Sequence, residues 1–287
     1  MAENDITIQW FPGHMAKTRC LMTDSLKLVD AVVEVTDARI PQSSRNPEMD
    51  ELVGRKPRIV LLNKCDTADE TVTSRWIQKY KESGIPALAT DCKSGKNVSK
   101  VLPLARDTLK DTIERWNAKG MTGRAVRLMI VGIPNAGKSS LINRLSGTKS
   151  TKVEDRPGVT KGKQWVTLSK DFEILDMPGV LWPKFEDQNV GLALAFTGAV
   201  KDDIMDMESL AVHFISTLRA VSVAPLETRY KISVSENLSD HEILELIGKK
   251  RGFLVSGGEI DTERAAIMLL DEFRSGKLGR ISLEEPK

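Results

Sequence analysis

The sequence contains little of what marks a secreted, disulfide-linked or membrane-spanning protein. Its three cysteines, Cys20, Cys65 and Cys92, lie far apart along the chain, which argues against a disulfide framework and against a zinc site. The longest apolar runs have the length of a strand and are too short to cross a bilayer. The first residues lack the basic and apolar regions of a secretory signal. We therefore expect a cytoplasmic protein in a reducing compartment.

The chain also lacks a strong net charge, and its value of +2 by itself says nothing about nucleic acid. The charge is unevenly distributed, because residues 201–287 hold 12 basic and 16 acidic side chains, a net −4, which leaves +6 for the first 200 residues. Six basic residues and only two acidic ones lie between Arg144 and Lys163. A solvated surface is the ordinary interpretation of such a cluster, and contact with RNA is the functional one.

Strand and helix patterns alternate over the first 200 residues, which is typical of a mostly parallel sheet flanked by crossover helices. We expect strands at 29–36, 58–63, 85–90, 127–132, 165–168 and 172–176, and helices at 15–28, 71–83, 98–118 and 138–145. After about Val200 the strand signal fades, and three helices are expected at 208–220, 239–252 and 263–275. The sequence therefore predicts an α/β domain over 1–200 and a small helical domain over 201–287.

A glycine-rich segment after the fourth expected strand fits the phosphate-binding pattern G-x-x-x-x-G-K-[ST]. In this P-loop, backbone N–H groups can surround the phosphates, and the following helix N-terminus adds a favourable field. We expect Lys138 to neutralise the β and γ oxygens, as a catalytic group, and Ser139 to ligate Mg²⁺. The GTP-binding residues expected here are Gly132, Pro134, Asn135, Ala136, Gly137, Lys138, Ser139 and Ser140.

A second motif, Asn63-Lys64-Cys65-Asp66, fits the guanine-reading pattern N-K-x-D at the end of the second expected strand. The carboxylate of Asp66 can accept hydrogen bonds from the N1–H and the amino group of guanine, whereas adenine would leave it unpaired. A loop after the third strand is expected to flank the base through its backbone. The residues expected to bind GTP there are Asn63, Lys64, Asp66, Thr90, Asp91 and Cys92.

The third motif, Asp176-Met-Pro-Gly179, fits D-x-x-G and follows the last expected strand. We expect Asp176 to hold Mg²⁺ through water and the Gly179 N–H to sense the γ-phosphate. Thr160, in Arg156-Pro-Gly-Val-Thr160, is the candidate for a catalytic threonine that closes over Mg²⁺. The expected Mg²⁺ ligands are therefore Ser139, Thr160 and Asp176.

The order of these motifs is unusual, because N-K-x-D precedes the P-loop, whereas ordinary GTPases place it last. The same sheet can form if the segment 102–123 joins the former ends. The sequence thus predicts a circularly permuted P-loop GTPase domain. Its end falls just after D-x-x-G, so the helical domain follows directly on a segment that responds to the γ-phosphate.

With these motifs placed, the chain resembles the circularly permuted GTPases of ribosome assembly, most of all the YlqF/RbgA type that matures the bacterial large ribosomal subunit. The resemblance extends nearly from end to end, and beyond the motifs it covers residues 10–17 (WFPGHMAK), 37–41 (DARIP), 44–47 (SRNP), 181–186 (LWPKFE) and 197–199 (TGA). It implies a helical, RNA-contacting C-terminal domain and a nucleotide-controlled association with the large subunit.

One position departs from general GTPase chemistry. Val180 follows D-x-x-G, where Ras-like proteins keep a water-orienting glutamine, and the family likewise carries a hydrophobic residue there. We consider that His14 orients the water instead, against the alternative of a capping or packing histidine. We also consider that Asn135 helps to hold K⁺ beside the phosphates, as in potassium-dependent GTPases that this segment resembles, against the alternative of an ordinary loop residue.

The expected function is GTP hydrolysis, stimulated by the ribosomal subunit, by a protein that binds the maturing large subunit in its GTP form and drives or checks a late assembly step. Off the ribosome we expect a monomer. The RNA contacts are expected at Lys161, Lys163, Lys249, Lys250 and Arg251. The alternative is a nucleotide-gated RNA-binding scaffold with negligible turnover, since the glutamine is missing. A membrane or tRNA-modification GTPase is disfavoured because transmembrane spans and extra catalytic domains are absent.

Overall fold

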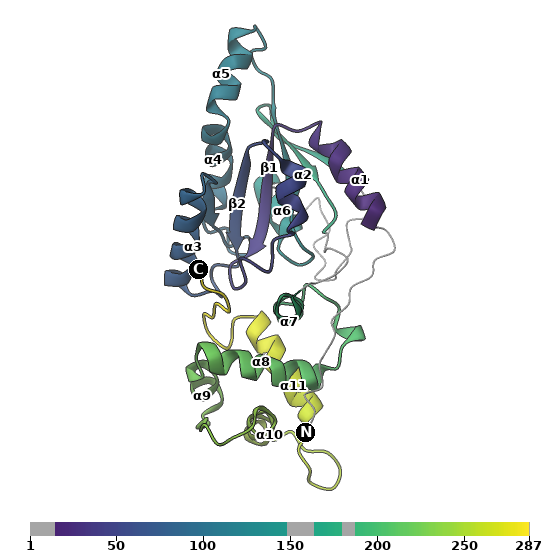
Figure 1. Ribbon diagram of the computed structural model, residues 1–287, viewed down its shortest axis with the longest axis vertical. Helices are drawn as coiled ribbons and strands as arrows, with labels where there is room; N and C mark the ends of the chain where they lie inside the picture. Colours follow the sequence, from purple (N-terminus) through teal and green to yellow (C-terminus); the bar gives the residue numbers. More distant parts are fainter. Residues whose placement is uncertain (1–14, 148–163, 180–186, 287) are drawn as a thin grey trace. The chain divides into compact units, whose positions relative to one another are not determined.

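The computed structural model describes residues 15–147, 164–179 and 187–286, which form two compact units (Figure 1). The larger unit holds residues 15–147 and 164–179 together with the C-terminal residues 284–286. The smaller unit holds residues 187–283.

The larger unit is built on a six-stranded sheet with the order β3-β2-β1-β4-β6-β5. Neighbouring strands are parallel except for β5, which is antiparallel to β6. This confirms the mostly parallel sheet, and each of the six expected strand segments forms a strand. Their bounds are β1 Ala31–Asp37, β2 Arg58–Asn63, β3 Ala87–Ala89, β4 Val126–Val131, β5 Gln164–Ser169 and β6 Phe172–Asp176.

Helices cover this sheet because its strands carry apolar side chains on both faces. One cluster packs Met22 and Met49 of two helices against Met129 and Leu175 of the strands, while Ile130 on the opposite face is equally buried. The helices of this unit are α1 Met15–Leu26, α2 Glu48–Val53, α3 Glu70–Glu82, η1 Val98–Lys100, α4 Val101–Thr108, α5 Lys110–Ala118 and α6 Lys138–Ser146.

Two features of these helices differ from the sequence-based expectation. The short helix α2 was not predicted, because its six residues are too few to show helical periodicity. The expected helix 98–118 is divided into η1, α4 and α5. The break between α4 and α5 lies at Leu109, whose backbone leaves the helical region at φ −101° and ψ 10° and whose side chain is buried.

The smaller unit is built of helices joined by loops, with one antiparallel bridge between Leu254 and Ile260 among its described residues. The three predicted helices are present, and the predicted capping box joins Ser239 and Glu242 while Gly252 ends that helix in the left-handed region. Two further helices, α7 and α9, were not predicted. The bounds are α7 Gln188–Phe196, η2 Asp202–Ile204, α8 Met207–Val221, α9 Ala224–Tyr230, α10 Asp240–Arg251 and α11 Thr262–Arg274.

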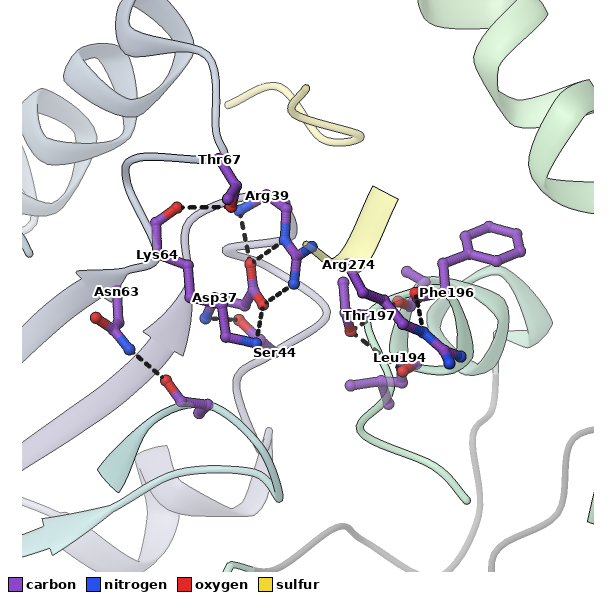
Figure 2. A network of polar contacts seen from close by, with 12 residues as sticks. Asp37, Arg39, Ser44, Asn63, Lys64, Thr67, Leu194, Phe196, Thr197 and Arg274 are labelled. Atoms are coloured by element: carbon purple, nitrogen blue, oxygen red, sulfur yellow. Dashed lines mark hydrogen bonds and ion pairs between the residues drawn. The ribbon is translucent and has the colours of Figure 1, made fainter. Parts of the chain in front are cut away.

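The helix α7 belongs to the smaller unit, although the expected boundary at residue 200 assigned it to the GTPase domain. The ring of Phe214 in α8 lies 5.1 Å from that of Phe196 and 4.7 Å from that of Phe273. Arg274 of α11 donates to the carbonyl of Phe196 at 3.0 Å (Figure 2). It also pairs with Asp202 at 2.6 Å. These contacts fix the C-terminal end of α7 within the helical core.

Over the described parts of the chain, no single helix is long and apolar enough to cross a membrane. Only α8 and α9 taken together reach that length and composition, and they are bent by 118° at the break between them.

Candidate active site

The predicted nucleotide motifs meet at one edge of the sheet. The P-loop follows β4, N-K-x-D follows β2, D-x-x-G follows β6, and the loop with Thr90 follows β3. Because these strands are parallel, their carboxyl ends lie at the same edge, which is where open α/β sheets bind ligands. The permuted chain therefore assembles the constellation that the motif order predicted.

Two glycines of the P-loop allow a close approach of backbone that a side chain would prevent. Gly132 has φ 150°, and a Cβ atom there would lie 2.3 Å from the Val35 carbonyl oxygen. Gly137 has φ 103°, and a Cβ there would lie 2.1 Å from the Asn63 amide nitrogen. Asn135 also takes the left-handed conformation, at φ 57°. The loop ends where α6 begins at Lys138, with Ser139 and Ser140 half-buried in the first turn.

Asn63 joins three of the loops, and Figure 2 shows its bond to the P-loop. Its Nδ2 donates to the Ala136 carbonyl of the P-loop at 2.7 Å, and its Oδ1 accepts from the Cys92 backbone N–H at 3.0 Å. Asn63 is buried, so these bonds are shielded from water. The side chain thus sets the distance between the expected phosphate and guanine positions.

The loop after β3 is shaped by its own side chains. The carboxylate of Asp91 accepts from the backbone N–H groups of Lys93 at 2.8 Å and Ser94 at 3.1 Å. Burial raises the pKa of the Cys92 thiol to about 12, so this thiol stays protonated at neutral pH. Asp91 and Cys92 therefore contribute the loop's conformation and backbone groups.

Lys64 of the guanine motif is held by the end of β1. It takes the left-handed conformation at φ 59°, and its Nζ lies 3.0 Å from Asp37 Oδ2. Arg39, which is fully buried, donates to the same carboxylate from Nε at 2.9 Å and from a terminal nitrogen at 2.7 Å. Burial alone would raise the pKa of Asp37, but Arg39 and Lys64 outweigh it and hold that pKa well below its usual range.

Asp66 is exposed, as a group that reads a ligand must be before the ligand binds. The turn that presents it is closed by the Thr67 hydroxyl, which donates to the Lys64 carbonyl at 2.9 Å. The helix α3 follows at once, capped by the Asp69 carboxylate on the Val72 N–H at 2.8 Å. The carboxylate of Asp66 thus stands on a short, well-anchored turn.

Lys138 and Asp176 form the buried charged centre of the site. Lys138 Nζ donates to the carbonyls of Gly132 at 3.1 Å and Ile133 at 2.8 Å. Burial lowers the pKa of Lys138 to about 8, against the opposing charge of Asp176. Burial likewise raises the pKa of Asp176 to about 6, which the positive charge of Lys138 partly offsets.

The carboxylate of Asp176 fits a Mg²⁺ site. Both of its oxygens are buried, and within the described part of the chain neither has a hydrogen-bond partner. A buried anionic group of this kind is costly unless a cation or a water bound to one satisfies it. Ser139 lies in the adjacent first turn of α6.

Gly179, the last residue of D-x-x-G, lies against the P-loop. A Cβ atom there would come within 2.8 Å of Lys138 Nζ and 3.0 Å of the Pro134 Cα. Any side chain would have to displace the end of Lys138 or the loop backbone. The close approach of the Pro134 backbone means that the packing of the two motifs favours a glycine at this position.

Four of the predicted residues, His14, Thr160, Lys161 and Lys163, lie outside the described residues, so the structure does not place them. The helix α1 begins directly after His14 and packs near the site. Its Met22 shares a cluster with Met177 of D-x-x-G, and Met22, Gly132 and Pro178 line one small cavity.

The expected RNA-contacting residues of the smaller unit end α10. Lys249 and Lys250 are exposed. Arg251 is also exposed, but it pairs with Glu272 at 3.1 Å and lies over the Tyr230 ring at 5.1 Å. The two lysines are thus more available to a partner than the arginine is.

Sequence reasoning assigned no role to Asp37 and Arg39. Both stood out only as part of the segment 37–41, within the resemblance. The sequence did offer one signal, which was an acidic residue at the end of a buried strand, two positions before an arginine. Burying such a charged pair costs desolvation energy, which further contacts must offset. The structure supplies that reason in Lys64.

Comparison with known proteins agrees with this geometry. A family model described as a 50S ribosome-binding GTPase matches residues 127–250. The ribosome biogenesis GTPase A of Priestia megaterium is 48% identical over 98% of this chain and 98% of its own length. The protein of the same name from Thermotoga maritima is 35% identical over 98% of this chain and 95% of its own.

A solved structure shows the same relationship. The GNP-bound crystal structure of YlqF from T. maritima matches with a TM-score of 0.65 and 32% identity, over 94% of this chain and 99% of that one. The sequence identity, the coverage and the permuted motif order all indicate the same family. A GTPase family implies a Mg²⁺ ion, and the Asp176 carboxylate is suited to hold it. The chain therefore belongs to the ribosome biogenesis GTPase A family and is a circularly permuted GTPase that hydrolyses GTP.

Proposed function

We propose that this chain binds the maturing large ribosomal subunit in its GTP form and hydrolyses GTP to drive or check a late assembly step. The observation that carries the proposal is the Asp176 carboxylate, which is buried near Lys138 and has no hydrogen-bond partner among the described residues. It lies at the strand edge where the guanine motif is bonded to the P-loop. Support for the target comes from the matching family, described as 50S ribosome-binding.

In this proposal the guanine base lies between N-K-x-D and the loop after β3. Asp66 accepts the two hydrogen bonds that distinguish guanine, and Lys64, fixed by Asp37, borders the base. Asn63 holds both loops to the P-loop. Thr90, Asp91 and Cys92 complete the pocket through their backbone.

The phosphates are bound by the backbone of residues 132–140 and by Lys138. Lys138 would exchange its two carbonyl partners for the β and γ oxygens, since its lowered pKa of about 8 still leaves it mostly protonated at pH 7. Ser139, Thr160 and Asp176 would hold Mg²⁺, which neutralises the charge that develops on the transferred phosphoryl group.

Catalysis must use a group other than the missing glutamine. We assign the orientation of water to His14, because α1 starts directly after it and packs Met22 against Met177 of D-x-x-G. We further assign to Asn135 a part in holding K⁺ beside the phosphates, supported by its left-handed position inside the P-loop. GTPase rates that are equal in KCl and NaCl at matched ionic strength would exclude the K⁺ site.

The large-subunit contact is proposed to be with RNA. Lys161 and Lys163 follow Thr160 closely in the sequence, so their phosphate contacts would depend on the nucleotide. Lys249, Lys250 and Arg251 would bind in both states. We propose that the protein is a monomer off the ribosome and works in the cytoplasm.

The runner-up is a nucleotide-gated scaffold with negligible turnover, favoured only by Val180 in the glutamine position. Turnover measured with and without large subunits separates the two. Stimulation by the subunits supports the GTPase proposal, and turnover that stays negligible in their presence supports the scaffold.

A further inference from the structure

The segment from Asp37, the last residue of β1, to Ser44 forms a loop that is buried except at Gln42. The Asp37 N–H donates to the Ser44 hydroxyl at 3.0 Å, and the Ser44 N–H donates to the Ile40 carbonyl at 2.9 Å. Arg39 and Ile40 are fully buried. We call residues 37–44 the β1 loop, and these bonds hold its two ends together.

The first end of the β1 loop contacts the guanine motif. Asp37 binds the Lys64 ammonium at 3.0 Å, and the Ala38 N–H donates to the Asn63 carbonyl at 2.8 Å (Figure 2). Two consecutive residues of N-K-x-D are therefore anchored on the loop. A shift of the loop would move the groups proposed to border the base.

The other end of the β1 loop binds the C-terminal residues. The Glu284 carboxylate accepts from the Gln42 N–H at 2.6 Å and from the Ser43 N–H at 3.1 Å. Two successive backbone N–H groups aimed at one anion form a compact anion site. At its second end the loop thus binds a carboxylate, and both of these N–H groups donate to it.

The helix α3 contributes the rest of the tail's binding surface. The Trp76 indole Nε1 donates to the Glu284 carbonyl at 3.2 Å, and Arg75 pairs with Glu285 at 2.6 Å. We call residues 284–286 the tail. The Glu284 carbonyl, the half-buried Glu284 carboxylate and the exposed Glu285 carboxylate are each bound by a different group of the GTPase unit, so the contact is specific.

We propose that the β1 loop couples tail docking to guanine-nucleotide binding, so that each raises the affinity of the other. The inference rests on the proposed guanine-reading role of residues 63–66. A docked tail fixes the backbone of Gln42 and Ser43. Ser44 is bonded to Asp37, so Asp37 is also held in position. Asp37 in turn binds the Lys64 ammonium. Because coupling is reciprocal, bound nucleotide strengthens tail docking by the same factor.

The contacts predict which nucleotides take part. They lead to the base-reading loop, which GDP and GTP occupy alike, so the coupling should not depend on the γ-phosphate. Residues 275–283 lead directly into the tail. Because the chain is continuous, a tail whose docking depends on nucleotide would link the helical unit to the occupancy of the guanine site.

The test compares Glu284→Ala with Glu259→Gln, an exposed glutamate of the helical unit, as the matched control. Dissociation constants for GDP and for a non-hydrolysable GTP analogue are measured by titration on the full chain. We expect Glu284→Ala to weaken both ligands three- to tenfold with their ratio unchanged, and Glu259→Gln to change neither. Unchanged affinities in Glu284→Ala would overturn the coupling while leaving the proposed function intact.

A second measurement is made on the wild type, and a variant serves only to assign one signal. The Trp76 indole N–H is followed by hydrogen exchange with and without GDP, and Trp76→Phe assigns its signal. Coupling predicts at least threefold slower exchange when GDP is bound, and equal rates would overturn it. A wild type that fails to bind guanine nucleotides at all would instead refute the proposed function on which the coupling rests.

Discussion

Asn63 Nδ2 lies 2.7 Å from the carbonyl oxygen of Ala136 and donates a hydrogen bond to it, so the guanine motif and the P-loop share one buried bond. In the sequence these residues are far apart and in permuted order. The bond shows that permutation has moved the chain ends without separating the two halves of the nucleotide site.

The first prediction concerns this bond. Replacing Asn63 by Ala removes both its donor and its acceptor and leaves the Ala136 carbonyl and the Cys92 N–H without that partner. A buried polar group left unpaired costs about 1–3 kcal/mol. We expect affinities for GDP and GTP to fall at least tenfold together. Calorimetric titration checks this, and a variant with wild-type affinity for both nucleotides would show that the bond does not organise the site.

The second prediction concerns base specificity at Asp66. Asp66→Asn exchanges an acceptor for a donor, so it should bind GTP much more weakly and gain affinity for xanthosine triphosphate. Competition titrations with the two nucleotides measure the switch, and Asp69→Asn, which changes the α3 cap instead, is the control. Hydrolysis of GTP at wild-type efficiency by Asp66→Asn would remove Asp66 from the guanine site.

The third prediction concerns the raised pKa of Asp176, about 6. The folded protein without nucleotide holds the proton of the Asp176 carboxyl group more tightly than the unfolded chain does. The stability that protonated Asp176 contributes is therefore lost as pH rises towards 6. Asp176→Asn should therefore raise the stability of the nucleotide-free protein at pH 7.5, by up to about 3 kcal/mol. The gain should shrink at pH 4.

Thermal unfolding at the two pH values, without nucleotide or Mg²⁺, measures this gain. The same variant should lose the Mg²⁺ dependence of GTP binding, because the amide is a poor substitute for the carboxylate. A variant that is destabilised at pH 7.5 and keeps its Mg²⁺ dependence would contradict the assignment.

The fourth prediction concerns His14. His14→Ala should lower subunit-stimulated turnover tenfold or more and leave GTP affinity unchanged, because a group that orients water acts on the reaction and not on the bound ground state. Single-turnover hydrolysis and nucleotide titration separate the two effects. Unchanged turnover would reduce His14 to a capping or packing residue.

Much of the fold could be predicted because its signals are local. The strands β2, β4 and β6 are apolar runs that end at chemical motifs, and the capping box of Ser239 and Glu242 marks the start of α10. Short elements such as α2 and α9 could not be predicted, since six or seven residues show little periodicity. The helix α7 joins the helical unit through Phe196 and Arg274, and these contacts are visible only in three dimensions.

The same distinction applies to the site. Motif spacing identifies Lys138, Asp66 and Asp176 because each has a fixed chemical role in GTP binding. It does not reveal that Asp37 binds Lys64, since the pair is formed by adjacent strands and no pattern in the sequence relates them. The Glu284 contact with residues 42 and 43 is equally hidden, because it joins the end of the chain to its beginning.

The fifth prediction concerns the two basic clusters. Charge reversal at Lys161 and Lys163 should abolish the preference of the large subunit for the GTP form, because these residues closely follow Thr160 in the sequence. Lys250→Glu should weaken the binding of both nucleotide forms alike, since the exposed end of α10 carries no nucleotide-responsive motif. The salt dependence of subunit binding shows how many RNA phosphates each variant still neutralises. The assignment fails if the two classes of variant behave identically.

The most direct measurement is co-sedimentation of the wild-type protein with purified large ribosomal subunits, in the presence of a non-hydrolysable GTP analogue or of GDP. We expect the protein to sediment with the subunit in the analogue and to stay mostly in the supernatant in GDP. Equal co-sedimentation in the two nucleotides would contradict a nucleotide-controlled association with the large subunit.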